Sequence, residues 1–189
     1  MSKASDTKKE IRTRINKIRQ SFSKEKIIDK SRRVISQLLD FEQYKNANSI
    51  MSYISLDFEV NTKEFIKNEL SKANKEIFVP FLEEDKIKVS RMKKFNNIVK
   101  GNYGVLEPKN KDIYEEGIDI ILVPGTAFDK KGRRIGFGKG YYDSFLKQYL
   151  YSLKIGIAFE EQIVDLIPEE EHDVQMDMII TDKRIIKCS

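Results

Sequence analysis

The chain has 189 residues, of which 40% are hydrophobic and 34% are charged, a length and composition that support one globular domain and argue against disorder. No apolar run approaches the roughly 20 residues of a membrane-spanning helix, the polar N-terminus has no signal segment, and the single cysteine, Cys188, cannot form an internal disulfide. We therefore expect one soluble domain over residues 1–189, monomeric and located in the reducing cytoplasm, with no membrane partner.

The net charge of +5 is concentrated near the N-terminus, where residues 1–33 hold 12 Lys and Arg against 4 Asp and Glu. The remaining residues are therefore slightly acidic in sum. A nucleic-acid-binding domain would instead carry a basic face assembled from much of the domain. We expect no nucleic-acid partner, although a basic helical arm remains an alternative.

A basic amphipathic helix is predicted over about residues 8–21, opened by a capping box of Thr7 and Glu10. Its apolar residues recur on one stripe, at Ile11, Ile15, Ile18 and Phe22. Lys8 and Arg12 lie one turn apart, where they could hold a polyphosphate; from the residues alone, a solvated helix face is favoured. The other basic residues of the helix are expected on the surface, namely Lys9, Arg14, Lys17 and Arg19.

Helices and strands alternate along the rest of the chain. Further helices are predicted over about residues 24–39, from Asn61 onwards and from Tyr141 onwards, with a short one at Glu160. Strands are predicted over residues 49–54, 76–81, 86–92, 120–123, 153–159 and, as the last strand, 178–181. This order predicts an α/β fold: a three-layer α/β/α domain, Rossmann-like, with a mostly parallel sheet and helices on both faces.

Two regions outside the central loop contain candidate binding residues. Glu59 follows the first predicted strand, and ligands of α/β sheets gather at the carboxyl ends of strands, although most loop glutamates are merely exposed. The loop-rich segment 93–116 contains Phe95, Tyr103 and Tyr114, which could stack on a planar ring or form a satellite core.

The central stretch, residues 120–146, indicates an anion-binding loop between a strand and a helix. The apolar run stops at Pro124 and Gly125, and glycines then alternate at Gly136, Gly138 and Gly140. Backbone N–H groups there could approach a phosphate closely, and the following helix would add its dipole.

Three cations accompany this loop, Arg133, Arg134 and Lys139. The glycine spacing fits neither a Walker A loop nor the G-x-G-x-x-G pattern. From the residues alone, a phosphate cradle and a flexible surface turn with solvated cations are equally favoured.

The same stretch resembles the signature of the 5-formyltetrahydrofolate cyclo-ligase family, also called methenyltetrahydrofolate synthetases. The resemblance is carried by Val123-Pro-Gly-Thr-Ala-Phe-Asp129 and by Gly132-x-Arg134-x-Gly136-x-Gly138-x-Gly140-Tyr-Tyr-Asp143. It extends to Lys8-x-x-x-Arg12 and to Gly104-x-x-Glu107-Pro108, and so covers nearly all of the chain. No motif residue is replaced by an incompatible one.

The resemblance implies an enzyme that converts 5-formyltetrahydrofolate, with or without a polyglutamate tail, to 5,10-methenyltetrahydrofolate. ATP would phosphorylate the formyl oxygen, N10 would attack the formyl carbon, and ADP and phosphate would be released. The amide-like formyl carbon resists attack until its oxygen becomes a good leaving group. Catalysis would then depend on positioning and charge stabilisation, without a protein nucleophile.

The resemblance also implies the site residues. Those expected to bind ATP are Lys8, Arg12, Arg134, Gly136, Gly138, Lys139, Gly140, Tyr141 and Tyr142. Those expected to bind the folate are Ile54, Glu59, Phe137, Gly138, Lys139, Gly140 and Tyr141. Arg134 and Lys139 are the catalytic candidates, since either could neutralise charge during phosphoryl transfer. Many family members have glycine in place of Lys139, so this lysine is expected to help rather than to be essential.

The cofactor implied is Mg²⁺, bound by Asp143 and Asp177, with Asp173 as the alternative to Asp177. Other acidic residues, Asp129, Asp182 and the run 169–171, could equally be solvated or capping groups. His172, the only histidine, is expected at the surface or in a cap.

Two other functions are compatible with the sequence. One is a basic RNA- or nucleotide-binding module that uses the N-terminal helix and the Arg133–Arg134 loop, with an affinity that falls steeply with salt and does not depend on Asp143. The other is an ATP-dependent ligase or kinase that acts on a different small substrate.

Overall fold

The structure is a computed structural model that describes residues 3–96, 98–101 and 104–188. Tyr103, a candidate stacking residue, lies outside these residues. Among the helices of the described part, none combines the length and the apolar character that crossing a membrane requires.

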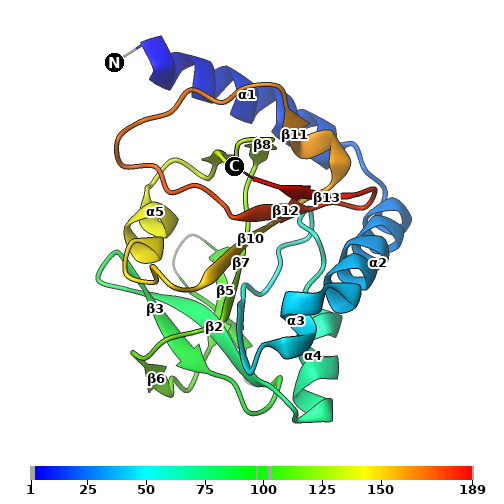
Figure 1. Cartoon of the computed structure of the whole chain (residues 1–189), viewed down its shortest axis with the longest axis vertical. Helices are drawn as coiled ribbons and strands as arrows, with labels where there is room; N and C mark the ends of the chain where they lie inside the picture. The colour runs from blue at the N-terminus through cyan, green and yellow to red at the C-terminus, as the bar shows by residue number, and fades with distance from the viewer. Residues whose placement is uncertain (1–2, 97, 102–103, 189) are drawn as a thin grey trace.

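An eight-stranded sheet forms the centre of the molecule (Figure 1). Its strands are β1 (Ser49–Ser52), β2 (Glu76–Glu83), β3 (Lys86–Arg91), β6 (Ile113–Tyr114), β7 (Ile120–Val123), β10 (Leu153–Ile157), β12 (Met178–Ile180) and β13 (Ile185–Lys187). Their order is β13-β12-β10-β7-β1-β2-β3-β6. The five strands from β12 to β2 are parallel, and the strands added at either edge are antiparallel. The predicted mostly parallel α/β sheet is confirmed.

Helices cover both faces of this sheet. On one face lie α2 (Lys24–Asp40), α3 (Glu42–Asn46) and α4 (Lys63–Lys72), and on the other lies α5 (Tyr141–Leu146) (Figure 1). Successive residues of a strand point to opposite faces. Ile50 accordingly joins the core beneath α2 to α4, while Met51 joins the core beneath α5. Because both faces are covered, the residues of β7 are all buried, which explains its continuous apolar run.

The N-terminal helix α1 (Lys3–Gln20) packs against a second, three-stranded sheet of β8 (Ala127–Asp129), β9 (Arg134–Ile135) and β11 (Ile163–Val164). Ile15 of α1 is buried there against Ala127 and Ile135. This sheet lies where β7 leads into β8, so α1 crosses that end of the molecule (Figure 1). The remaining short elements are β4 (Ile98–Lys100), β5 (Leu106–Pro108) and the 3₁₀ turn η2 (Glu160–Gln162).

Three details of the secondary-structure prediction are wrong. Helix α1 begins at Lys3, so Thr7 lies within it and no capping box starts there; neither proline nor glycine precedes Thr7 to stop the helix. The expected loop after β7 contains the hairpin β8–β9. Finally, β12 is followed by one more strand, β13, which pairs with it at the sheet edge.

Gly132 fixes the turn between β8 and β9. Its φ is 82°, a conformation that favours glycine, and an added Cβ would lie 2.3 Å from the carbonyl oxygen of Met176. Its own carbonyl accepts a hydrogen bond from the Met176 amide at 2.8 Å. The hairpin is thereby held against the segment that leads into β12.

Candidate functional site

A cleft of about 470 Å³ opens at the carboxyl ends of β1, β2 and β7. Tyr53 and Ile54 follow β1, Pro80 and Phe81 belong to the end of β2, and Pro124 follows β7. This volume lies within the roughly 300–1,000 Å³ of small-molecule sites. Its position is also the one at which open α/β sheets bind ligands.

The cleft brings together every predicted site residue except Asp177. These residues are Lys8, Arg12, Ile54, Glu59, Arg134, Gly136, Phe137, Gly138, Lys139, Gly140, Tyr141, Tyr142 and Asp143. They come from α1, the loop after β1, strand β9, the glycine loop between β9 and α5, and α5 itself.

The glycine loop lies directly against α1. The Nε atom of Arg12 donates a hydrogen bond to the carbonyl of Gly136 at 2.9 Å. Gly138 has a φ of 93°, and a Cβ there would lie 3.4 Å from the Arg12 guanidinium. A cation of α1 and the backbone of the loop therefore line the same part of the cleft. Helix α5 has only six residues, so the dipole expected from it is small.

Arg134 and Asp143 form an ion pair in the wall of the cleft. Arg134 is only 7% exposed, and its Nη2 atom lies 3.0 Å from Oδ1 of Asp143. The same carboxylate oxygen accepts a hydrogen bond from the amide of Val174 at 3.3 Å. The guanidinium also lies 5.5 Å from the ring centroid of Tyr142. The pair thus places one buried cation beside one carboxylate at the start of α5.

Lys8 connects α1 to a loop near the other end of the chain. Its Nζ atom lies 2.6 Å from Asp173 Oδ2 and 2.8 Å from Glu170 Oε2. Burial lowers the pKa of Lys8, but the hydrogen bonds and negative charges of these two carboxylates outweigh that effect and the net pKa is raised. Lys8 is therefore a firmly charged cation at the edge of the cleft.

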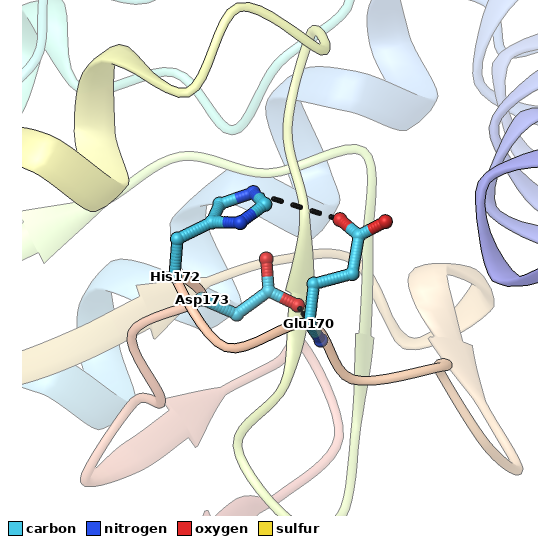
Figure 2. Close-up of side chains that lie close together, drawn as sticks. All are labelled: Glu170, His172 and Asp173. Carbon is cyan, nitrogen blue, oxygen red and sulfur yellow. Dashed lines mark hydrogen bonds and ion pairs between the residues drawn. The ribbon is translucent and has the colours of Figure 1, made fainter. Parts of the chain in front are cut away.

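Figure 2 shows Glu170, His172 and Asp173 side by side in this loop. Their potential ligand atoms lie within 4.8 Å of one another, and His172 Nε2 is 3.6 Å from Glu170 Oε2. The side chain of His172 is 64% exposed, as expected for a surface residue, but it also lines the cleft.

Asp177 does not lie with these residues. It precedes β12 at the amino end of that strand, away from the strand ends that form the cleft. Its Oδ2 atom accepts a hydrogen bond from the amide of Lys154, at the amino end of β10, at 2.6 Å. The structure therefore does not bring Asp177 together with Asp143, whereas the alternative, Asp173, lines the same cleft as Asp143.

Glu59 lies in the cleft wall with only 9% of its surface exposed. Its Oε2 atom accepts a hydrogen bond from the amide of Leu56 at 2.9 Å. Burial raises the pKa of this carboxyl, although the Leu56 hydrogen bond and the positive charges of Arg19 and Lys63 act in the opposite direction. A buried carboxylate beside the apolar side chain of Ile54 can bind a ligand that offers N–H donors on an otherwise apolar ring.

Several other candidates have structural roles. Arg133 pairs with Asp129, whose carboxylate also accepts hydrogen bonds from the backbone of the β8–β9 turn. Phe95 and Tyr114 pack against the two cores and do not line the cleft. Asp182 pairs with Lys30.

Sequence reasoning missed an apolar part of the cleft and one buried cation. Pro80, Phe81 and Leu82 line the cleft because they lie near the end of β2, and the strand-end rule applied to Glu59 could have found them. Arg19 was expected at the surface but is 1% exposed, because the loop around Phe58 covers it. No sequence pattern signals that contact.

The fold and the cleft together define an α/β ligand-binding protein whose site combines a glycine loop, buried cations and several carboxylates. The sequence profile of the 5-formyltetrahydrofolate cyclo-ligase family matches residues 4–182. The chain belongs to this family.

Individual relatives agree over most of the chain. The 5-formyltetrahydrofolate cyclo-ligase of Mus musculus is 29% identical over 188 residues, which cover 92% of each chain. A probable 5-formyltetrahydrofolate cyclo-ligase of Caenorhabditis elegans is 30% identical and covers 95% of each chain. The solved structure of 5,10-methenyltetrahydrofolate synthetase from Aquifex aeolicus superimposes with a TM-score of 0.85 at 31% identity, covering 95% of this chain and 92% of the other.

Proposed function

We propose that this protein uses ATP to convert 5-formyltetrahydrofolate to 5,10-methenyltetrahydrofolate. The observation that carries the proposal is that one cleft combines two kinds of lining. One part holds Glu59 beside apolar side chains, and another holds the glycine loop with its cations and carboxylates. The first kind of surface suits a folate and the second suits a nucleotide. The two must lie close together, because a phosphoryl group passes from the nucleotide to the folate.

The reaction proceeds in two steps. The formyl oxygen attacks the γ-phosphorus of ATP, the bond to the β-phosphate oxygen breaks, and ADP leaves. The nitrogen N10 then attacks the formyl carbon, the carbon–oxygen bond breaks to release phosphate, and the N10 proton is lost. The ring closes as the 5,10-methenyl product. No protein nucleophile is required.

The cations of the cleft are suited to the triphosphate. Arg12 and Lys8 extend from α1, Arg134 from β9 and Lys139 from the glycine loop. In the described structure, Arg134 pairs with Asp143 and Lys8 with Glu170 and Asp173. The phosphates would replace these carboxylates as partners of the cations. Arg134 and Lys139 would then stabilise the charge that develops during transfer.

The carboxylates released by this exchange fit Mg²⁺. Asp143, Asp173 and Glu170 offer hard oxygen ligands along the same cleft, which is the donor type that this ion prefers. We therefore infer a site of Asp143 with Asp173 and Glu170, in place of Asp143 with Asp177. When bound, Mg²⁺ would neutralise part of the phosphate charge.

The folate would bind at the Glu59 end of the cleft. A pterin ring presents adjacent N–H groups, and one carboxylate can accept hydrogen bonds from both in a bidentate arrangement. Ile54, Phe81 and the exposed Phe137 would contact the faces of the ring system. We further infer that the protein acts as a cytoplasmic monomer formed by one domain, and that it accepts substrates with or without a polyglutamate tail.

The test is the absorbance of the methenyl chromophore after mixing the protein with 5-formyltetrahydrofolate and MgATP. An ATP-dependent rise that is lost in Asp143→Ala and kept in Asp165→Ala, an exposed acid outside the cleft, is the expected result. No rise from a folded protein that still binds ATP would favour a ligase or kinase for another substrate. Salt-sensitive RNA binding that persists in Asp143→Ala would favour the basic binding module.

A further inference from the structure

Arg19 is a buried cation that the reaction described above does not use. It lies near the end of α1, two turns beyond Arg12, and is 1% exposed. It does not line the cleft, so it does not contact a ligand there. Arginine is rarely buried to this extent unless its charge has a partner.

Two segments that build the cleft, the turn at Gly125 and the loop before Glu59, meet at this side chain. Its Nη1 atom donates a hydrogen bond to the carbonyl of Gly125, after β7, at 3.2 Å. Gln162 donates to the same carbonyl at 2.8 Å. The guanidinium carbon lies 4.8 Å from the ring centroid of Phe58, the residue immediately before Glu59.

The rest of the guanidinium is poorly satisfied. Within the described residues, its Nε and Nη2 atoms are buried without a hydrogen-bond partner. Unpaired buried N–H groups on a cation destabilise a fold unless an opposite charge compensates. The negative charge on the adjoining segment is the Glu59 carboxylate, which follows Phe58; among the described residues it forms no direct ion pair with Arg19, and its charge acts over a longer distance. Burial lowers the pKa of Arg19, and Glu59 acts in the opposite direction.

We propose that Arg19 is a positioning residue for the substrate end of the cleft, where its guanidinium is the counter-charge of the Glu59 carboxylate and holds the Gly125 turn and the Phe58 segment together. This inference rests on the proposed function, in which an ionised Glu59 binds the folate.

Other groups that face Glu59 cannot replace Arg19. Lys63 of α4 is the second cation, but it is partly exposed, so solvent screens it. Tyr53 and Tyr142 also face the carboxylate, and burial raises the pKa of both phenols, so they stay neutral. Without the charge of Arg19, Glu59 would take up a proton at a higher pH and would lose its capacity to accept two hydrogen bonds.

The experiment compares Arg19→Met with Arg19→Lys, and uses Arg14→Met, an exposed arginine on the same helix, as the control. kcat/KM for 5-formyltetrahydrofolate is measured from acidic to alkaline pH at saturating MgATP. In Arg19→Met we expect the acidic limb of the kcat/KM profile to move to a higher pH by about one unit, which lowers kcat/KM about tenfold further at low pH. The KM for ATP should change less than about twofold. Arg19→Lys should keep the acidic limb in place. A loss that is uniform across pH, or equal in both KM values, would overturn the proposal.

A second measurement does not need activity. The unfolding midpoints of Arg19→Met, Glu59→Gln and the double variant form a double-mutant cycle. We expect Arg19→Met to be less harmful in the Glu59→Gln background, because the negative charge that Arg19 offsets is then absent. The proposal would be overturned if the changes in unfolding midpoint were strictly additive. It would also be overturned if Arg19→Met failed to fold and the double variant failed to fold as well. If the wild-type protein were inactive but the double-mutant cycle still showed coupling between Arg19 and Glu59, only the proposed reaction would be refuted.

Discussion

The guanidinium of Arg134 and the carboxylate of Asp143 face each other across the wall of the cleft, 3.0 Å apart. In the proposed function, the arginine would bind a phosphate of MgATP and the aspartate would bind the metal. The two side chains neutralise each other in the structure. Nucleotide binding would then separate them, and both new partners would have to arrive together, because either charge left alone would be costly.

Removing the negative member of this pair should affect the nucleotide end only. For Asp143→Asn we expect kcat to fall by on the order of 100-fold, with the dissociation constant of 5-formyltetrahydrofolate nearly unchanged. Steady-state kinetics and equilibrium binding of the folate measure the two quantities, with Asp165→Asn as the exposed control. Unchanged kcat would remove Asp143 from the reaction.

Lys8 should contribute to ATP binding and not to folate binding. Lys8→Ala is expected to raise KM for ATP about tenfold, the loss of roughly 1.4 kcal/mol expected for one charge-assisted contact. Lys17→Ala, on the exposed side of the same helix, should leave it unchanged. A larger rise in the KM for 5-formyltetrahydrofolate than in that for ATP would contradict the assignment.

Asp173 and Asp177 should behave differently when each is replaced by alanine. Asp173→Ala is expected to raise the Mg²⁺ concentration for half-maximal activity about 10- to 100-fold. Asp177→Ala should leave that concentration unchanged and lower the free energy of unfolding by about 1–2 kcal/mol, because the amide of Lys154 loses its acceptor. Metal titrations and urea denaturation separate the two effects; the reverse pattern would restore Asp177 as the ligand.

The affinity for the folate should fall as the pH decreases, and this fall should begin at a higher pH than it would if Glu59 had the pKa of an exposed glutamate. Burial raises the pKa of Glu59, so the ionised, hydrogen-bond-accepting form is fully present only at higher pH and is lost as the pH falls through that raised value. Equilibrium binding of 5-formyltetrahydrofolate from pH 5 to 8 should show this decline. Glu59→Gln should bind the folate weakly at every pH while binding ATP normally; equal loss of both ligands would count against the role of Glu59.

Gly132 should be intolerant of a side chain. Its positive φ and the 2.3 Å approach of the Met176 carbonyl to an added Cβ predict that Gly132→Ala lowers the free energy of unfolding by about 2–4 kcal/mol. Gly117→Ala is the matched control, since a Cβ there meets nothing within 4 Å. Similar denaturation curves for the two variants would mean that the β8–β9 turn can relax.

Local patterns predict the sheet and most of the cleft well. The apolar run Ile120–Val123 identifies a strand buried on both faces, and the positions of Glu59 and of the glycine loop after predicted strands place them at one edge. The family resemblance adds the cations of α1, which helical spacing alone does not distinguish from a solvated face.

What local patterns do not predict depends on contacts between distant segments. Asp173 and Asp177 are both acidic residues shortly before β12, and only the folded chain separates the residue that faces Lys8 from the one at the amino end of the strand. Arg19 resembles the exposed cations of α1 in sequence. Its burial depends on the Phe58 segment, which folds over it from elsewhere in the chain.

The contact of Lys8 with Glu170 and Asp173 joins residues that are 162 and 165 positions apart. During synthesis, the first part of the proposed nucleotide site is made long before its last part leaves the ribosome. The strands from β1 to β10 that belong to the central sheet all precede Glu170 and pair over shorter separations, so this part of the sheet can assemble before β12 and β13 are added and while this end of the cleft is still open. Retention on immobilised ATP should therefore report that a newly made chain has finished folding, and a chain stopped before Glu170 should not be retained.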